Sequence, residues 1–268
     1  MVITPQLGQR ASTDEACADR HAIKHSESGF KNYFYMQMPT LQKIQKDIFE
    51  KAIFFDVGGV LMSNDSVPFS ACLERVVGRP FREFRRSAVT YFYTRNTIDQ
   101  EAIAGFCEEL GLANFTKSAI EKEVDCFKSE KRRGRLYPDV EECLSALSAA
   151  NTIGVISNST EVSYEPLEQF GIARYLSCEI FSHIVGVAKP SYDIFKLALD
   201  NSKHVAKGDC IFVTDQEFEI NEILERHWIA IVVERHPDRS SITAKYVHNS
   251  GEFKLLTLPN LLDIFRYI

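Results

Sequence analysis

The chain has 268 residues, of which 45% are hydrophobic and 25% are charged, and a formal net charge of −6 at pH 7. This composition is typical of a soluble globular protein with one large domain, or with one domain that carries an inserted subdomain. The mild negative charge disfavours a dedicated binder of nucleic acid or of an anionic membrane, because neither polyanion is attracted to such a chain.

Hydropathy and cysteine usage indicate the compartment. No segment is apolar over the ~20 residues that a membrane-spanning helix needs, and the N-terminus has no apolar run of signal-peptide length. The seven cysteines are scattered without a CxxC pair, which favours packing in the core and a reducing compartment. We therefore expect a cytoplasmic protein with no membrane partner.

The first half of the chain combines a polar extension, one strand and a helical block. Residues 1–38 are polar and lack periodicity, which predicts an N-terminal extension. The next segments predict a helix over residues 39–51 and a buried strand over residues 52–55. From residue 66 to about residue 128 the periodicity is helical only. The segments predicted as helices there are 67–78, 99–112 (with Asp99 as its cap) and 116–130.

Helices and strands alternate in the second half of the chain. The predicted helices cover residues 139–150, 162–171, 191–202 and 219–227, and the predicted strands cover residues 152–157, 178–183, 209–215 and 229–234. Such alternation predicts an α/β fold, a doubly wound parallel sheet, here with an all-helical insert after the first strand. The predicted domains are a core (39–65 and 136–268) and a helical cap (66–135). We interpret the basic run 131–135 as a solvated linker in preference to an anion-binding site.

Polar residues fall at the ends of the predicted strands. Asp56 follows the first strand, Ser157 ends the second and is followed by Asn158, and Asp215 ends a later one. Lys189 lies just before a predicted helix. Because ligands of open parallel sheets bind beyond the carboxyl ends of the strands, we expect these side chains to share one site.

These residue types suit phosphoryl transfer. Asp56 would attack phosphorus as a nucleophile and form an aspartyl-phosphate. A phosphate dianion repels a carboxylate, so the site needs positive charge, which Mg²⁺ held by Asp56 and Asp215 would supply together with Lys189. The Ser157 hydroxyl and nearby backbone N–H groups would bind the phosphate oxygens. Each residue alone is weak evidence, because such residues are more often turn or cap residues, and the conjunction carries the prediction.

Four segments resemble the motifs of a known family. "FFDVGGVL", "VISNS", "GVAKPSYDIF" and "IFVTDQEFE" resemble, in this order, motifs one to four of the haloacid dehalogenase-like (HAD) hydrolase superfamily, over most of residues 51–234. The helical insert resembles the first-type cap of that superfamily. "DVGGV", "SNS" and the insert segment "YTRNTIDQEAIAGFCEELGL" are most similar to the bacterial sugar-phosphate phosphatase branch that includes α-glucose-1-phosphate phosphatase.

For the metal, the resemblance implies a set of oxygen ligands. Asp56 is expected to be both nucleophile and Mg²⁺ ligand, and the main-chain carbonyl of Gly58 a further ligand. Asp215 is expected on the metal as well, with Glu219 as the less regular final acid of the fourth motif.

For the phosphate, the resemblance implies contacts from Ser157 and Lys189. We expect Asn158 and the backbone of Gly58 and Gly59 to line the substrate position. The two glycines let the backbone turn sharply there, with N–H groups facing the phosphate.

Two positions depart from the family pattern. Thr214 stands where many relatives have Gly or Asp. Gly58 stands where most phosphatases of the superfamily carry a second Asp, which protonates the leaving alkoxide and later activates water. General acid–base catalysis is typically worth about 10²–10⁴ in rate. Hydrolysis of an alkyl phosphate should therefore be slow unless water, a cap residue or a good leaving group compensates.

Substrate choice is expected to lie in the cap and in the loop after the first motif. Arg95, in a turn between cap helices, is a candidate partner for a substrate group, and a solvated loop arginine is an equal alternative. His183 and His227 have no partner visible in the sequence, and we assign them no role.

Three functions remain open from the sequence. The first is a Mg²⁺-dependent phosphatase that acts on a small phosphorylated metabolite, such as a sugar phosphate. The second is a haloacid dehalogenase, which needs no second acid because a halide leaves without a proton, but which has no use for a metal ligand at Asp215. The third is a HAD-like protein that lost turnover and binds a phosphorylated metabolite or a protein partner.

Overall fold

The computed structural model describes residues 52–63, 67–129, 134–202, 210–225, 228–235 and 255–266. The predicted N-terminal extension and the predicted helix 39–51 lie outside these residues, as do His227 and residues 131–133 of the basic run. Within the described part, no helix is long and apolar enough to cross a bilayer.

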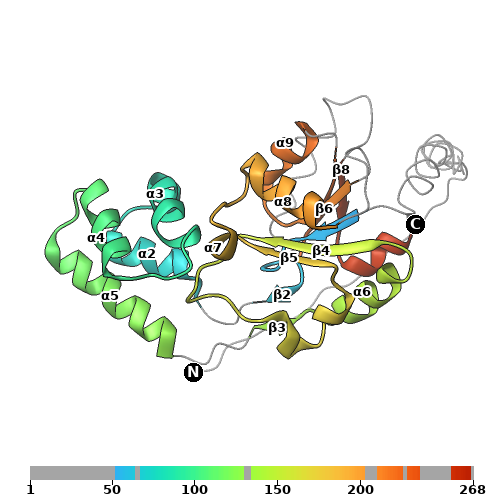
Figure 1. Cartoon of the computed structure of the whole chain (residues 1–268), viewed down its shortest axis with the longest axis horizontal. Helices are drawn as coiled ribbons and strands as arrows, with labels where there is room; N and C mark the ends of the chain where they lie inside the picture. Colours follow the sequence, from blue (N-terminus) through green and yellow to red (C-terminus); the bar gives the residue numbers. More distant parts are fainter. Residues whose placement is uncertain are drawn as a thin grey trace, which may run out of the picture. The chain divides into compact units, whose positions relative to one another are not determined.

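A parallel sheet of six strands forms the core, in the order β5-β4-β1-β6-β7-β8 (Figure 1). Its strands are β1 (Ala52–Phe55), β4 (Thr152–Ser157), β5 (Cys178–Phe181), β6 (Cys210–Thr214), β7 (Ile229–Val233) and β8 (Leu255–Leu258). All neighbouring strands pair in parallel. After β5 the chain crosses over β1 and builds the other half of the sheet, which confirms the predicted doubly wound α/β fold.

Helices cover both faces of the sheet because the central strands β1 and β6 are buried along their whole length. Ile53 and Phe55 of β1 belong to an apolar cluster with α6 (Val140–Ser148) and the 3₁₀ helix η5 (Leu261–Arg266). Ala52 and Phe54 alternate with them and belong to the opposite cluster, with α8 (Tyr192–Ser202) and α9 (Glu217–Glu225). Figure 1 shows α8 and α9 on one side of the sheet and α6 on the other. The alternation of side chains along β1 thus fixes the two layers.

The segment between the short strands β2 (Met62–Ser63) and β3 (Arg135–Leu136) is helical. These strands pair antiparallel, and between them lie α2 (Phe69–Val77), α3 (Phe81–Ala88), the π-helical η1 (Val89–Tyr93), α4 (Gln100–Glu109) and α5 (Asn114–Ser129). The helices share an aromatic core, in which the rings of Phe92 and Phe106 lie 4.7 Å apart. Asp99 accepts a hydrogen bond from the N–H of Ala102 (2.8 Å), which confirms the predicted cap of α4. We call this segment the helical insert.

Two predicted elements differ from the structure. The predicted helix 162–171 is reduced to the 3₁₀ turn η2 (Leu167–Phe170), because Pro166 cannot donate within a helix and restricts the residue before it to extended backbone. The predicted strand 178–183 ends at Phe181, and the short helix α7 (Ser182–Val185) follows it.

Other elements carried little sequence signal. Helix α3 was not predicted separately because its sequence "FREFRRSA" has few apolar residues. The two-residue strands β2 and β3 are too short to show alternation. Strand β8 and the 3₁₀ helices η3 (Ala173–Tyr175) and η5 were also missed.

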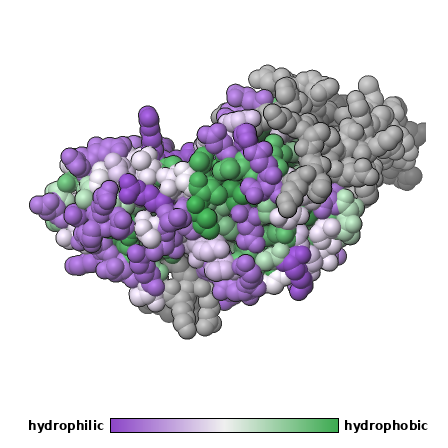
Figure 2. Space-filling model, in the orientation of Figure 1, coloured by the Kyte–Doolittle hydropathy of each residue, from purple (hydrophilic) through white to green (hydrophobic). Residues whose placement is uncertain are grey.

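The surface differs between the insert and the core. Figure 2 shows mainly hydrophilic side chains over the insert, and hydrophobic ones gathered over α7 and the segment that follows it. Ile184 of α7 is 52% exposed.

Candidate active site

The parallel register brings three strand ends to one edge of the sheet. Phe55 pairs with Val155 of β4 on one side and with Val213 of β6 on the other. Asp56, one residue further, donates its backbone N–H to the carbonyl of Val213 (2.8 Å). Ser157 is the last residue of β4. Asp56 and Ser157 therefore lie at the carboxyl edge, where open parallel sheets bind their ligands.

Lys189 is a buried cation at this edge. Its side chain is 1% exposed, and its Nζ lies 2.7 Å from Oδ2 of Asp56 and 3.1 Å from Oε1 of Glu219. Burial by itself lowers the pKa of Lys189, but the two carboxylates outweigh it and hold that pKa above its ordinary value. The ammonium group is therefore charged at neutral pH. Pairing with two acids offsets the cost of removing it from water.

Asn158 holds the backbone of Lys189 in place. Its amide donates to the carbonyl of Lys189 (2.9 Å), and its Oδ1 accepts the N–H of the same residue (2.7 Å). We predicted that Asn158 lines the substrate position. In the structure both ends of its side chain fix the loop that carries the lysine, and Asn158 also lines a cavity beside Gly58 and Ser157.

Glu219 also serves the lysine. Its Oε1 faces Lys189, and its Oε2 accepts the hydroxyl of Thr214 (2.6 Å). Burial, and then the charge of Asp56, raise the pKa of Glu219 to about 7, while Lys189 and Thr214 act against this rise. We predicted Glu219 as a metal ligand. Since both of its oxygens are engaged and its side chain is 1% exposed, we revise its role to positioning Lys189.

Thr214 departs from the family pattern for a structural reason. Its hydroxyl donates to Glu219 and accepts the backbone N–H of Gln216 (3.0 Å). The side chain of Gln216 in turn donates to Oδ1 of Asp215 (2.7 Å). Thr214 thus links the end of β6 to the acid that positions the lysine.

The two glycines after Asp56 meet different constraints. Gly59 has a φ of +77°, and a Cβ there would lie 2.3 Å from Oδ2 of Asp215. Only glycine fits this left-handed turn beside the carboxylate. At Gly58 a Cβ would meet no atom within 4 Å. A Cβ would thus fit at residue 58, so the absence of an acid there is not imposed by packing at the Cβ position.

Oxygen atoms suited to Mg²⁺ converge on this turn. The Asp215 carboxylate lies against Gly59, and Asp56 and the main-chain carbonyl of Gly58 belong to the same turn. Two carboxylates and a carbonyl are the hard oxygen donors that Mg²⁺ prefers, so the donor set fits this ion. Among the described residues, no group of three His, Cys, Asp or Glu side chains gathers as a metal cluster. A metal held here would therefore complete its shell with main-chain, water or ligand oxygens.

A cavity of about 100 Å³ lies beside Gly58 and Ser157. Other residues that line it are Val57, Met62, Asn158, Ser159, Ser163, Tyr164, Glu165 and Phe181. Glu165 directs its carboxylate at the backbone N–H of Gly134, which lies 3.1 and 3.2 Å from its two oxygens. The acid in the cavity wall is thus engaged in fixing the chain where it returns from the insert.

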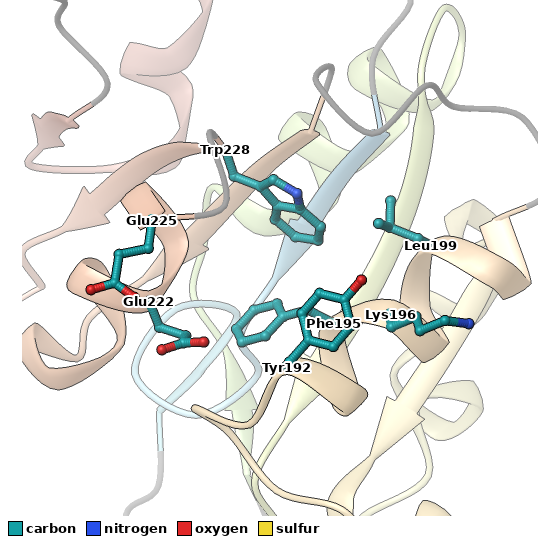
Figure 3. A pocket seen from close by; sticks show the side chains of 7 residues that line it. All are labelled: Tyr192, Phe195, Lys196, Leu199, Glu222, Glu225 and Trp228. Atoms are coloured by element: carbon teal, nitrogen blue, oxygen red, sulfur yellow. The ribbon is translucent and has the colours of Figure 1, made fainter.

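A larger cavity of about 310 Å³ lies between α8 and α9 (Figure 3). It is lined by Tyr192, Phe195, Lys196, Leu199, Glu222, Glu225 and Trp228, none of which is a strand-end residue. Lys196 pairs with Asp200, and two glutamates face the space, which disfavours a phosphate. Of these two cavities, only the smaller one is lined by the strand-end residues Gly58 and Ser157.

Arg95 does not join the strand-end residues. Its guanidinium lies 5.8 Å from the ring centroid of Tyr91, which belongs to the insert. Arg85 of α3 is the arginine that sequence reasoning missed. Burial is the largest effect on the pKa of Arg85 and lowers it, whereas the negative charge of Glu219 raises it. This half-buried cation therefore lies within electrostatic reach of Glu219. The basic helix "FREFRRSA" was the available signal.

Comparisons with known proteins agree with this geometry. Residues 50–220 match the family model of the haloacid dehalogenase-like hydrolases. No curated protein matches the chain. A 2-haloacid dehalogenase from Pseudomonas syringae pv. Tomato DC3000 has a similar structure, with 18% identity, a TM-score of 0.54 and coverage of 81% of this chain and 97% of its own.

Two further solved structures are similar at lower TM-scores. A HAD phosphatase from Thermococcus onnurineus is 16% identical (TM-score 0.48, 81% of this chain and 96% of its own). A HAD family enzyme from Bacteroides thetaiotaomicron, in complex with magnesium and inorganic phosphate, is 16% identical (TM-score 0.46, 71% and 98%). The dehalogenase, at 18% identity, shows only a shared fold, whereas the family model covers more than half of the sequence. This chain belongs to the haloacid dehalogenase-like hydrolase family.

Proposed function

We propose that the protein is a phosphatase that hydrolyses a small phosphorylated metabolite through an aspartyl-phosphate on Asp56. The observation that carries this proposal is the buried contact between Lys189 and Asp56, 2.7 Å long, at the carboxyl edge of the sheet. A buried ammonium group beside a strand-end carboxylate provides both a nucleophile and a group that attracts a phosphate.

The chain's own residues account for the first half of the reaction. Val57 donates its N–H to Oδ1 of Asp56 (2.7 Å), and Lys189 holds Oδ2, so the carboxylate has a fixed orientation. Lys189 and the Ser157 hydroxyl would bind oxygens of the transferred phosphoryl group. The Asp56 oxygen then forms a bond to phosphorus as the bond to the leaving oxygen breaks. Bound Mg²⁺, with Asp56, Asp215 and the Gly58 carbonyl as its ligands, would supply the remaining positive charge.

The substrate class follows from two features. The resemblance of "DVGGV" and of the insert to the sugar-phosphate phosphatase branch favours a sugar phosphate. The cavity of about 100 Å³ suits a small group beside the phosphate. We also propose that the helical insert, over residues 66–135, acts as the cap that selects the substrate.

A phosphoenzyme assay tests this proposal. With Mg²⁺ present, wild-type protein should retain acid-stable phosphate from an aryl phosphate and release inorganic phosphate from members of a panel of phosphorylated metabolites. Asp56→Asn keeps the size of the side chain but removes the nucleophile, so it should do neither. Wild-type protein that forms no phosphoenzyme and releases no phosphate would overturn the proposal.

A haloacid dehalogenase is the second candidate. Gly58 favours it, because a departing halide needs no proton. Asp215 disfavours it. The Asp215 carboxylate lies beside the Gly59 turn, where it suits a metal ligand, and a dehalogenase needs no metal. Release of chloride from a 2-haloacid without added metal, with no phosphatase activity, would select this candidate.

The third candidate is a binding protein without turnover. Its motivation is again Gly58, where the structure leaves room for an acid that the sequence does not supply. If neither wild type nor Gly58→Asp hydrolyses any phosphate ester, while inorganic phosphate or a metabolite still binds, this candidate replaces the phosphatase.

A further inference from the structure

A serine–histidine pair lies in the wall of the active-site cavity. Oγ of Ser159 and Nδ1 of His183 are 2.7 Å apart, and the two residues are only 8% and 6% exposed. Ser159 lines the cavity of about 100 Å³ together with Gly58 and Ser157. The histidine is therefore one hydrogen bond away from the space where the usual acid of residue 58 is missing.

The surroundings hold this pair rigidly. Ser182 accepts the backbone N–H of Ser159 (3.0 Å) and donates to its carbonyl (3.1 Å), which ties the loop after β4 to α7. The ring of His183 packs on those of Tyr164 and Phe181, with centroids 5.1 and 6.4 Å apart. The hydroxyl and the imidazole thus keep one relative orientation.

The electrostatic surroundings favour a neutral imidazole. Burial lowers the pKa of His183 below its ordinary value of 6.5, and the charge of Glu161 opposes this only in part. Glu161 itself accepts the N–H of Ile98 (2.7 Å) and lies 3.5 Å from Nζ of Lys128. Tyr164 is the other titratable side chain against the ring, and burial raises its pKa. In the tautomer with hydrogen on Nε2, Nδ1 accepts the Ser159 hydroxyl and is ready to take a proton.

We propose that Ser159 and His183 form the proton relay that replaces the carboxylate missing at Gly58. This inference rests on the proposed phosphatase function and adds the groups that carry its protons. Ser159 touches the reacting water, and His183 acts through it.

The protons balance over one turnover. When water attacks the aspartyl-phosphate, its oxygen bonds to phosphorus and the bond between phosphorus and the Asp56 oxygen breaks, which returns the electron pair to the carboxylate. The water proton passes to Oγ of Ser159 as the serine's own proton passes to Nδ1 of His183. The same path in reverse carries this proton to the leaving oxygen of the next substrate. One proton is taken and one is returned, so no further reactant is needed.

Phosphoenzyme lifetime tests the relay directly. His183→Asn keeps a hydrogen-bonding group near the serine but cannot take the proton, and Ser159→Ala breaks the path with a minimal change in volume. Each should lengthen the lifetime of the aspartyl-phosphate by about 10²-fold or more, and the double variant should add little. Ser202→Ala is the matched control, since that serine is also buried but lies on α8, where its hydroxyl donates to the carbonyl of Leu199, and it should leave the lifetime unchanged.

The pH profile separates a relay from a structural role. The first half of the reaction needs the protonated imidazole, so kcat/KM for an alkyl phosphate should fall as pH rises through the lowered pKa of His183. This limb should be absent in His183→Asn, and absent for an aryl phosphate, whose leaving group needs no proton. Gly58→Asp in the His183→Asn background should restore hydrolysis, because a carboxylate then replaces the relay.

The outcomes distinguish this inference from the function beneath it. If wild type forms a phosphoenzyme whose lifetime is unchanged in both His183→Asn and Ser159→Ala, the relay is wrong and the phosphatase stands. If the lifetime lengthens but Gly58→Asp does not restore turnover and the pH limb persists, the pair is structural only, and the relay is again wrong. If wild type forms no phosphoenzyme, both proposals fall.

Discussion

The carboxyl edge of the sheet and the helical insert use charge in opposite ways. At the edge, Lys189 is buried between Asp56 and Glu219 and is only 1% exposed. In the insert, the pair of Arg75 and Glu123 lies at the surface, with side chains 61% and 23% exposed, over a core of aromatic rings. Buried charges cost free energy unless all their partners are present, whereas surface pairs contribute little. The edge therefore concentrates buried charge, and the insert folds by apolar packing.

Removing the central cation should have the largest effect. Lys189→Met leaves two buried carboxylates without a counterion, and the free energy of unfolding should fall by about 3–5 kcal/mol, with phosphoenzyme formation lost. The lysine lowers the pKa of Glu219, so without it that pKa rises further, and the loss should be greatest at high pH and should shrink as Glu219 becomes protonated at lower pH. Urea denaturation at pH 8 and pH 5.5 measures this difference.

Lys196→Met is the matched control for that experiment. Lys196 also pairs with a carboxylate, Asp200, but both side chains are about half exposed. Its removal should leave both the urea midpoint and the phosphatase rate unchanged. Equal losses in the two variants would contradict the contrast between buried and surface charge.

The glycine pair should give the next largest effect. Gly59→Ala forces a side chain into a left-handed turn and against Asp215, which should lower the free energy of unfolding by about 1–3 kcal/mol and reduce phosphate release. Gly58→Ala meets no atom within 4 Å and should cost far less. Urea midpoints and initial rates of the two single variants measure this difference. Equal losses of stability and activity in both variants would show that the left-handed turn does not require glycine at residue 59.

The strand-end residues were predictable because their signal is local. A run of apolar residues that ends in Asp56, Ser157 or Asp215 marks the carboxyl end of a buried strand. The alternation of helices and strands along the chain then predicts a parallel sheet, in which these ends lie at one edge. The fold class was predictable for the same reason, since periodicity alone separates helices from strands. The contrast between Gly58 and Gly59 could also be anticipated, because only one of them occupies a family acid position.

The contacts between loops were not predictable. Lys189 meets Asn158 across 31 residues, and Ser159 meets His183 across 24. Both contacts form only when β4 and β5 pair and their following loops come together. Glu219 was placed on the metal because its position in the motif suggested it, whereas burial and two partners assign it to the lysine. Such pairings depend on tertiary packing and leave no periodic trace in the sequence.

The insert should affect binding more than chemistry. Arg85 of α3 is half-buried within electrostatic reach of Glu219, whereas Arg95 packs on Tyr91. Arg85→Gln should raise KM by about tenfold, which is about 1.4 kcal/mol, and leave the hydrolysis rate of the phosphoenzyme unchanged. Arg95→Gln should change neither quantity. Steady-state and single-turnover kinetics measure both, and a slower hydrolysis step in Arg85→Gln would contradict the division between edge and insert.

The smallest expected effect concerns the stability of the protein in acid. Burial lowers the pKa of His183 in the folded state, so the unfolded chain binds the proton more readily. The favourable contribution of neutral His183 should therefore be complete above its ordinary pKa of 6.5 and should be lost as the pH falls through the lower, folded value.

Wild type and His183→Asn should accordingly converge in free energy of unfolding as the pH falls from 8 to 5. The effect is small because a single proton is involved, and because Glu161 partly offsets the burial. Urea titrations of both proteins at several pH values measure the convergence, with Ser163→Ala as a variant that should keep a constant difference from wild type. A difference between wild type and His183→Asn that stays constant with pH would mean that the imidazole is solvated in the folded state. A solvated imidazole would exchange its proton with water directly, and the edge of the sheet would then have no buried group to take over the task of the acid missing at Gly58.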